Sequence, residues 1–546
     1  MARVQRHYAL GLLCLAALLP TLAFASPASA RNATSLTIEQ EHAALADGKL
    51  TSVQLTRAFL ARIQKYEPFY NAFTAMDKNA LEDARASDAR RRAKQSRSLL
   101  DGVPIVIKDS VDVAGLPTTG GWLSAQAGGI NLVPSHDAPV VARLRRAGAI
   151  IIGKTNLPAF SGSGNSANTS WAGPTYSVLN RSWAPGGSST GTAAAVAADF
   201  ATAGIGEETG GSIQNPSAAE SLVGIKPTFA LVPNSGVQPL AGSTRDVIGP
   251  IAKTVPDAAD MLNVLAGYTL KDPKTTAAIG NIPAGGYKSD LSQTALVGAR
   301  LGLYGPGWRK KDPLSTETAK LYAAAIGTIE AQGATPVPDP FRGSGFAAVA
   351  DTSQGFDPRG LESLPYDMNN YLRNLGPTAR VHSVKQLGKA LGGALFGPKG
   401  PMHTFIDLSS EAKWSAKHLT VAPDLSVFRE AREKYLRILN RVMDENDLDA
   451  LVFPQATDEI PKLYGGGEID STTVSEINIA GLPAVVVPAG RYPDGKPFSL
   501  EFIGRPWSEA QLIGYAYAYE QATHARIVRT KLATTPGPKP PPPKGK

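Results

Sequence analysis

Short runs of β-branched residues alternate with helical segments through the first 265 residues of this chain, and the alternation limits the folds open to it. Residues 103–107 form a continuous apolar run with the length of a buried strand. Residues 140–156 read as a helix, a glycine turn and a strand, and residues 191–206 as a helix of small residues leading into another strand. This pattern is typical of an α/β fold. We therefore expect a mixed, mostly parallel twisted sheet with helices covering both faces.

The later part of the chain changes in character without an internal repeat. Residues 343–425 are broken by Pro and Gly and read as irregular, whereas helices predicted at 425–446 and 508–522 restore a regular pattern. We expect one folded domain over residues 31–533 and not several domains. Its expected core is about 36–265 and 425–525, with a variable region at about 266–424 that shapes the substrate pocket.

Both ends of the chain have a distinct composition. Arg3 and Arg6 precede a short apolar run, and residues 28–30, Ala-Ser-Ala, have the form of a cleavage site. We expect residues 1–30 to be a signal peptide and the protein to be exported to the periplasm or secreted. The apolar run is short for a membrane span, so we expect no stable membrane insertion after its removal. Residues 534–546 predict a flexible Pro/Lys-rich tail.

Composition argues against several kinds of site. The only cysteine, Cys14, lies in the N-terminal apolar run, which leaves the mature chain without a thiol for catalysis, disulfides or metal binding. No H-E-x-x-H spacing occurs, and Thr209 breaks the dinucleotide fingerprint that Gly204 and Gly206 begin, so we expect neither metal nor cofactor. The net charge of +8 is not gathered into basic clusters with aromatics, so we expect no nucleic-acid partner.

Three polar sets carry residue types suited to nucleophilic catalysis. Ser212 follows two glycines in "GEETGGSIQNPS" (206–217), Lys108 follows the strand at 103–107, and Ser188 lies in the glycine-rich turn of "PGGSSTGTAAAVAA" (185–198). A serine hydroxyl is a weak nucleophile and needs an adjacent base. No histidine lies near Ser212 in the sequence, but a lysine kept neutral by burial can serve as the base.

These motifs, with "GVPIVIKDSVDVAG" (102–115) and "AGLPAVVVPAG" (480–490), resemble the amidase signature family. The resemblance implies an α/β amidase fold and a Ser–cis-Ser–Lys triad. In this triad Ser212 is the nucleophile, Ser188 follows a cis peptide bond and relays the proton, and Lys108 is the base. The oxyanion hole that the resemblance implies consists of the backbone N–H groups of Thr209, Gly210, Gly211 and Ser212.

The chain departs from the family pattern beside the nucleophile. Glu208 and Gln214 stand where many members carry Asp and Arg, so an ion pair between these positions cannot form here. The Glu form resembles the branch of peptide amidases, aryl acylamidases and cyclic-oligoamide hydrolases. By resemblance, Asn156, Ser189 and Glu208 are expected to support the site. Residues expected to contact substrate along the cleft are Ser161, Asn165 and Trp171.

Together with the predicted signal peptide, the resemblance leads us to expect an exported serine amidohydrolase that cleaves a small-molecule or peptide amide through an acyl-enzyme on Ser212, with esterase or carbamate hydrolysis as possible side activities. Two alternatives stay open: a non-catalytic amide-binding protein on the same fold, and an amidotransferase subunit of a multi-chain complex. The export signal argues against the second. Ser189 also matches the nucleophile elbow of α/β-hydrolases, but no convincing Asp and His follow it. The sequence does not indicate which amide is cleaved, nor the oligomeric state.

Overall fold

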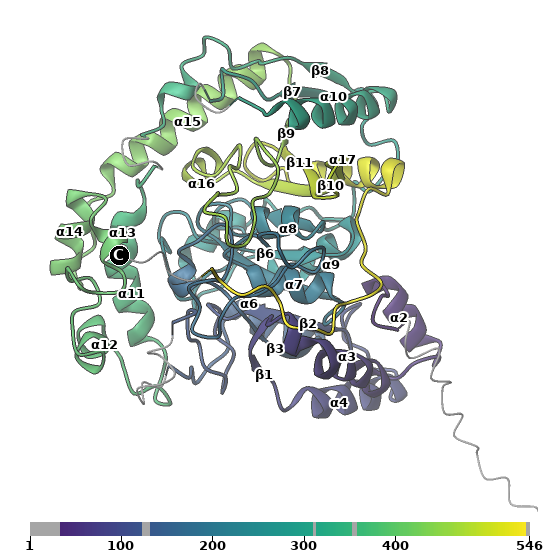
Figure 1. The fold of residues 1–546 in the computed structure, drawn as a ribbon, viewed down its shortest axis with the longest axis vertical. Coiled ribbons are helices and arrows are strands. Elements are labelled where there is room, and N and C mark those ends of the chain that lie inside the picture. The colour runs from purple at the N-terminus through teal and green to yellow at the C-terminus, as the bar shows by residue number, and fades with distance from the viewer. Residues whose placement is uncertain (1–32, 123–131, 310–312, 352–356, 542–546) are drawn as a thin grey trace, which may run out of the picture.

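One mixed sheet forms the centre of the molecule (Figure 1). The computed structural model describes residues 33–122, 132–309, 313–351 and 357–541. In spatial order the strands are β1 (Phe73–Met76), β3 (Ile150–Thr155), β2 (Pro104–Lys108), β4 (Ala203–Glu208), β6 (Val247–Ala252), β5 (Val223–Lys226), β10 (Ala484–Arg491), β11 (Pro497–Ile503), β9 (Ala450–Pro454), β7 (Arg300–Leu303) and β8 (Thr335–Val337).

The sheet combines parallel and antiparallel pairings. β3, β2 and β4 pair in parallel, as do β9, β7 and β8, whereas the other pairings between described strands are antiparallel. The predicted α/β class with a mixed sheet is confirmed, but the expectation that it is mostly parallel is wrong. One reason is the short connection at 492–496 between β10 and β11, because a tight turn can join only antiparallel neighbours.

Alternating side chains of β2 show that helices cover both faces of the sheet, as predicted. Ile105 and Ile107 join a core with helices α6 (Pro139–Ala147), α9 (Val255–Leu265), α10 (Thr316–Ala331) and α17 (Glu509–Thr523). Val106 faces the opposite core, which contains α3 (Ser52–Tyr66), α4 (Ala80–Arg92) and α7 (Thr190–Ala197). Because side chains alternate along a strand, Lys108 points to the same face as Val106, toward the start of α7.

The segment predicted to be irregular, residues 343–425, contains helices with a core of their own, seen at the left of Figure 1. They are α11 (Leu364–Arg373), α12 (Val384–Ala390), α13 (His403–Ile406) and α14 (Ser410–Lys417). Pro365 lies in the first turn of α11, where a missing N–H costs nothing, so the proline here begins a helix instead of breaking one. The sequence pattern underestimated the regular structure of this region.

The other helices are short or lie at the edges of the domain. The α-helices are α2 (Ile38–Ala46), α8 (Gln214–Ala219), α15 (Ser426–Glu445) and α16 (Glu476–Ala480). The 3₁₀ turns are η1 (Glu67–Phe69), η2 (Ala159–Ser161), η3 (Pro273–Ala278), η4 (Phe346–Ala348) and η5 (Leu361–Ser363).

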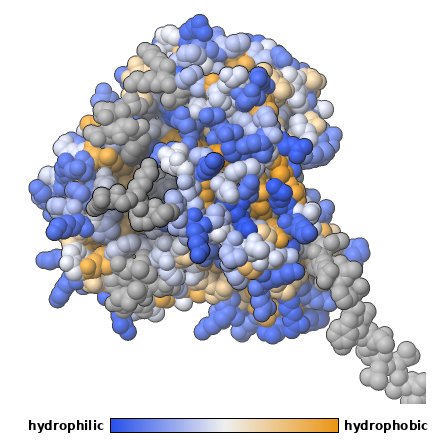
Figure 2. Space-filling model, in the orientation of Figure 1, coloured by the Kyte–Doolittle hydropathy of each residue, from blue (hydrophilic) through white to orange (hydrophobic). Residues whose placement is uncertain are grey.

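The predicted signal peptide lies outside the described residues, and none of the described helices has the length and apolarity needed to cross a bilayer. In the orientation of Figure 1 the surface is mainly hydrophilic, with hydrophobic side chains gathered in a hollow to the right of centre (Figure 2).

After α17 the chain runs back across the domain. There Tyr176 Oη donates to the carbonyl of Pro538 at 3.1 Å, so the first residues of the predicted tail lie against the domain.

Helix α3 begins with a capping box. Thr51 Oγ1 accepts the backbone N–H of Gln54, and the Gln54 side chain accepts the N–H of Thr51 at 2.9 Å. Both groups would otherwise lack a partner within the helix. The first residue of the helix, Ser52, is also fixed to Asp88 of α4 by a hydrogen bond of 2.6 Å. The cap therefore sets where α3 starts beneath the sheet.

Replacing Thr51 with Ala should lower the free energy of unfolding by about 1 kcal/mol, the usual cost of losing a capping oxygen. Thr51→Ser keeps that oxygen and serves as the control. Urea unfolding followed by circular dichroism measures both variants. Equal stability of the two variants would contradict the assigned role of the cap.

Candidate active site

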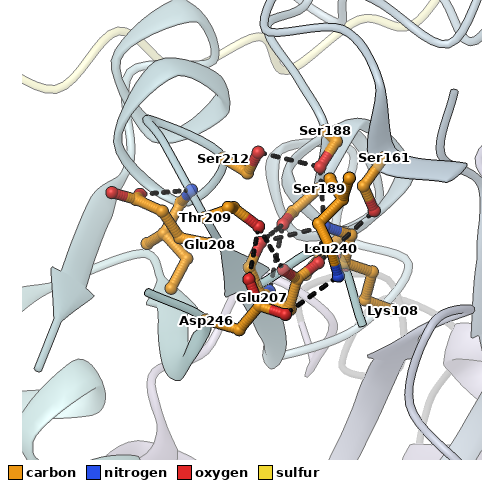
Figure 3. Close-up of polar contacts among 12 residues, drawn as sticks. Lys108, Ser161, Ser188, Ser189, Glu207, Glu208, Thr209, Ser212, Leu240 and Asp246 are labelled. Atoms are coloured by element: carbon orange, nitrogen blue, oxygen red, sulfur yellow. Dashed lines mark hydrogen bonds and ion pairs between the residues drawn. The ribbon is translucent and has the colours of Figure 1, made fainter. Parts of the chain in front are cut away.

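The residues predicted to form the triad lie in one hydrogen-bonded row (Figure 3). Lys108 Nζ is 2.7 Å from Ser188 Oγ, and Ser188 Oγ is hydrogen-bonded to Ser212 Oγ at 2.8 Å. The peptide bond between Gly187 and Ser188 is cis, in agreement with the family resemblance. Lys108 ends β2 and Ser212 follows β4, and these parallel neighbours end at the same edge of the sheet.

The loop before Ser212 presents unused backbone donors. The N–H groups of residues 209–212 donate no hydrogen bond to any other described residue. Gly211 has a φ of +85°, in the left-handed region that glycine adopts readily and that lets the loop turn sharply. Thr209, Gly210 and Ser212 line a cavity beside the site. This arrangement has the donors that a tetrahedral oxyanion requires.

Glu208 holds the nucleophile loop from behind. Its Oε2 accepts the backbone N–H groups of Ile213 and Gln214 at 2.8 and 3.2 Å. The side-chain amide of Gln214 donates to the other carboxylate oxygen at 2.5 Å, and that of Asn478 does so at 3.0 Å. Between positions 208 and 214, where the sequence excludes an ion pair, the structure therefore has a hydrogen bond between a carboxylate and a side-chain amide.

Ser189 and Asn156, the other expected supporting residues, tie neighbouring segments to the site. The N–H of Ser189 donates to the carbonyl of Ser212 at 3.2 Å, which connects the cis-peptide turn with the nucleophile. Asn156 Nδ2 donates to the carbonyl of Gly173 at 2.9 Å, and its Oδ1 accepts Ser170 Oγ at 2.6 Å. Asn156 thus orders the loop that follows β3 without lining the cavity itself.

A cavity of about 570 Å³ opens beside Ser212. Of the residues expected to contact substrate, Ser161 and Asn165 line it, but Trp171 does not. The indole N–H of Trp171 donates to Thr119 Oγ1 at 2.8 Å. A contact between Trp171 and substrate stays a prediction. Aromatic residues of the cavity wall that the sequence did not single out are Trp308, Phe346, Phe405 and Tyr435.

Two buried carboxylates that the sequence analysis did not assign face the lysine. Glu207 Oε2 accepts a hydrogen bond from Lys108 Nζ at 2.7 Å, and Thr209 Oγ1 bridges Glu207 and Asp246 at 3.2 and 2.6 Å (Figure 3). Burial lowers the pKa of Lys108, and the charge of Glu207 opposes that shift. Burial, followed by repulsion from Glu207, raises the pKa of Asp246 to about 7.

The sequence alone did not single out Glu207. Two consecutive acids end the strand, and neighbouring side chains of a strand point to opposite faces. This alternation places only one of Glu207 and Glu208 on the face of Lys108, and it is the contact in the structure that shows Glu207 to be the partner. Among the described residues, no group of three or more His, Cys, Asp or Glu side chains is arranged to hold a metal ion.

Known proteins resemble this chain over nearly its whole length. The amidase family profile matches residues 54–513. A glutamyl-tRNA(Gln) amidotransferase subunit from Chloroflexus aggregans is 33% identical, covering 91% of this chain and 98% of the relative. A probable amidase of Arabidopsis thaliana is 30% identical and covers 90% of each chain. A peptide amidase crystallised with the competitive inhibitor chymostatin has a TM-score of 0.73 at 30% identity, covering 90% of this chain and 98% of that one.

The fold and these matches define a class of hydrolase that acts on amide bonds. The chain belongs to this amidase family, so the family resemblance read from the sequence is confirmed. A peptide amidase among its structural neighbours agrees with the branch that Glu208 indicated.

Replacing Glu208 with Ala should leave two backbone N–H groups and two side-chain amides without their acceptor. A hydrogen bond to a charged group contributes about 1.5–3 kcal/mol, so we expect a comparable loss in the free energy of unfolding. Amide hydrolysis should fall with it, because the loop carrying Ser212 loses its support. Denaturation and activity assays measure both effects. A variant that keeps wild-type stability would contradict this role.

Proposed function

We propose that the protein is an exported serine amidohydrolase that forms an acyl-enzyme on Ser212. One observation carries this proposal: the row from Lys108 through Ser188 to Ser212 ends at a cavity beside backbone N–H groups that donate to no other described residue. A binding protein would have no use for a buried lysine joined to a serine by a second hydroxyl.

The proposed mechanism begins with attack of Ser212 Oγ on the amide carbonyl carbon. The hydroxyl proton of Ser212 passes to Ser188 while the proton of Ser188 passes to Lys108 Nζ. The N–H groups of residues 209–212 stabilise the oxyanion. The proton then returns along the row to the departing nitrogen as the C–N bond breaks. A water molecule, deprotonated by the same row, hydrolyses the acyl-enzyme.

The cavity favours an amide whose acyl part is apolar or aromatic. Its lining includes the aromatic residues Trp308, Phe346 and Tyr435 as well as polar residues such as Ser161 and Asn165. A volume of about 570 Å³ lies within the usual range for small-ligand pockets. A related peptide amidase binds the competitive inhibitor chymostatin. We therefore propose peptide amides and arylalkyl amides as the first substrates to test.

A second candidate is an amidotransferase subunit, which the 33% identity to the Chloroflexus protein favours. The two candidates differ in location and in partners. A mature N-terminus near Arg31 in an exported fraction, found by mass spectrometry, supports the amidohydrolase. An N-terminus at Met1 in a cytosolic multi-chain complex would support the amidotransferase instead.

Purified protein should hydrolyse a peptide amide without any partner chain, and a fluorophosphonate should label Ser212. Ser212→Ala should abolish both turnover and labelling. Lys108→Ala should reduce turnover by about 10²–10⁴-fold, the usual contribution of a general base. Tryptic mapping identifies the labelled residue. Ser189→Ala removes the neighbouring hydroxyl of the same turn. It tests whether the loss of turnover is specific to the hydrogen-bonded row of Lys108, Ser188 and Ser212. Labelling at any residue other than Ser212 would overturn the assignment.

A further inference from the structure

Glu207 surrounds the amine of Lys108 with acceptors. The side-chain nitrogen is 2.9 Å from the backbone carbonyl oxygen of Glu207 and 2.7 Å from its carboxylate. Its third neighbour is Ser188 Oγ at 2.7 Å. The side chains of Lys108 and Glu207 are 0% and 1% exposed, so no bulk water competes for these contacts. One residue therefore provides two of the three hydrogen-bond partners of the amine.

The number of protons on the amine decides what these contacts do. A neutral amine has two N–H groups and one lone pair. If both N–H groups donate to Glu207, the lone pair must point to Ser188, whose own hydroxyl can then donate to it. After proton transfer the ammonium has three N–H groups, which match the carbonyl, the carboxylate and Ser188 Oγ. The same geometry suits the base before and after it takes the proton.

The charges around Lys108 are mostly negative. Glu207 and Glu208 belong to β4, and Asp246 precedes β6, while Asp109, the residue after Lys108, pairs with Lys154 at 3.3 Å. Burial lowers the pKa of Lys108, and the charges of Glu207, Asp246 and Glu208 oppose this in that order. Removing the charge of Glu207 should therefore let the amine lose its proton at lower pH.

We infer that Glu207 is a positioning residue for Lys108, which directs the lone pair of the amine to Ser188 and sets by its charge the pH range in which the amine acts as a base. The inference rests on the proposed function, because it presumes that Lys108 is the base. It assigns Glu207 a role beyond a structural ion pair. A structural pair would change stability when broken, but it would not move the pH dependence of acylation.

Two substitutions separate the charge of Glu207 from its side-chain hydrogen bond. Glu207→Gln keeps a side-chain acceptor and removes the charge. Its acidic limb of kcat/KM should move to lower pH by at least about one unit, the low end for a charge within about 4–6 Å. Glu207→Ala removes the acceptor as well. It should show the same shift and an additional loss of kcat of at least about tenfold, because the amine is no longer directed.

The measurement uses the full-length protein, a para-nitroanilide for turnover and a fluorophosphonate for acylation of Ser212 at each pH. The wild-type rate should rise with pH as Lys108 loses its proton. Asp101→Asn is the matched control, since it breaks a buried ion pair with Arg90 (2.6 Å) at the start of β2, away from the row. The acidic limb of its kcat/KM profile against pH should stay where it is in the wild type, even if the midpoint of its thermal unfolding falls.

If Glu207→Gln does not fold, Asp246→Asn tests the same idea. Its limb should move in the same direction but by less, because Asp246 is linked to Glu207 through Thr209 and, among the described residues, has no hydrogen bond to Lys108. Identical limbs in wild type and in every folded variant, with Ser212 labelled, would overturn the role of Glu207 alone. Absence of labelling at Ser212 in the wild type would instead overturn the proposed function.

Discussion

The burial of Lys108 is the constraint on which the rest of the site depends. A charged amine is costly in a low-dielectric interior unless it is paired, and a neutral one needs acceptors for its N–H groups. The structure meets both needs with Glu207 and Ser188, at 2.7 Å each. The strand that ends at Lys108 is central and fully buried, so the lysine cannot move out to solvent as a surface lysine would. The fold therefore holds the lysine beside a hydroxyl.

Small residues are required around this lysine because backbones approach one another closely. A methyl group at Gly187 would lie 2.5 Å from the carbonyl oxygen of Ser163, and one at Gly206 would lie 2.8 Å from Ser189 Oγ. These distances are shorter than van der Waals contact. The glycines and serines that looked like an ordinary turn in the sequence therefore mark the place where the cis-peptide turn, β4 and the cavity wall meet.

Much of the fold and of the site was readable because local patterns carry it. The buried strand ending at Lys108, the small-residue helix after Ser188 and the family motif around Ser212 were all predicted, and the structure joins the three side chains. Ser161 lines the cavity beside Ser212 and Trp171 does not, because proximity in sequence does not say which way a loop side chain turns. The helices within 343–425 were missed because each is short and has only a few apolar residues. These residues form a core only when the helices pack together.

The sequence by itself determined the α/β class, the amidase family and the residue types of the row, since strand periodicity, turn residues and motif spacing are local properties. Only the tertiary structure decided which strands of the sheet pair in an antiparallel way. It also decided that Trp308, Phe346 and Tyr435 line the cavity and that Glu207 pairs with Lys108. These depend on which strands become neighbours and on which face each side chain occupies. Residues 99 positions apart meet at the lysine, and no local pattern records that contact.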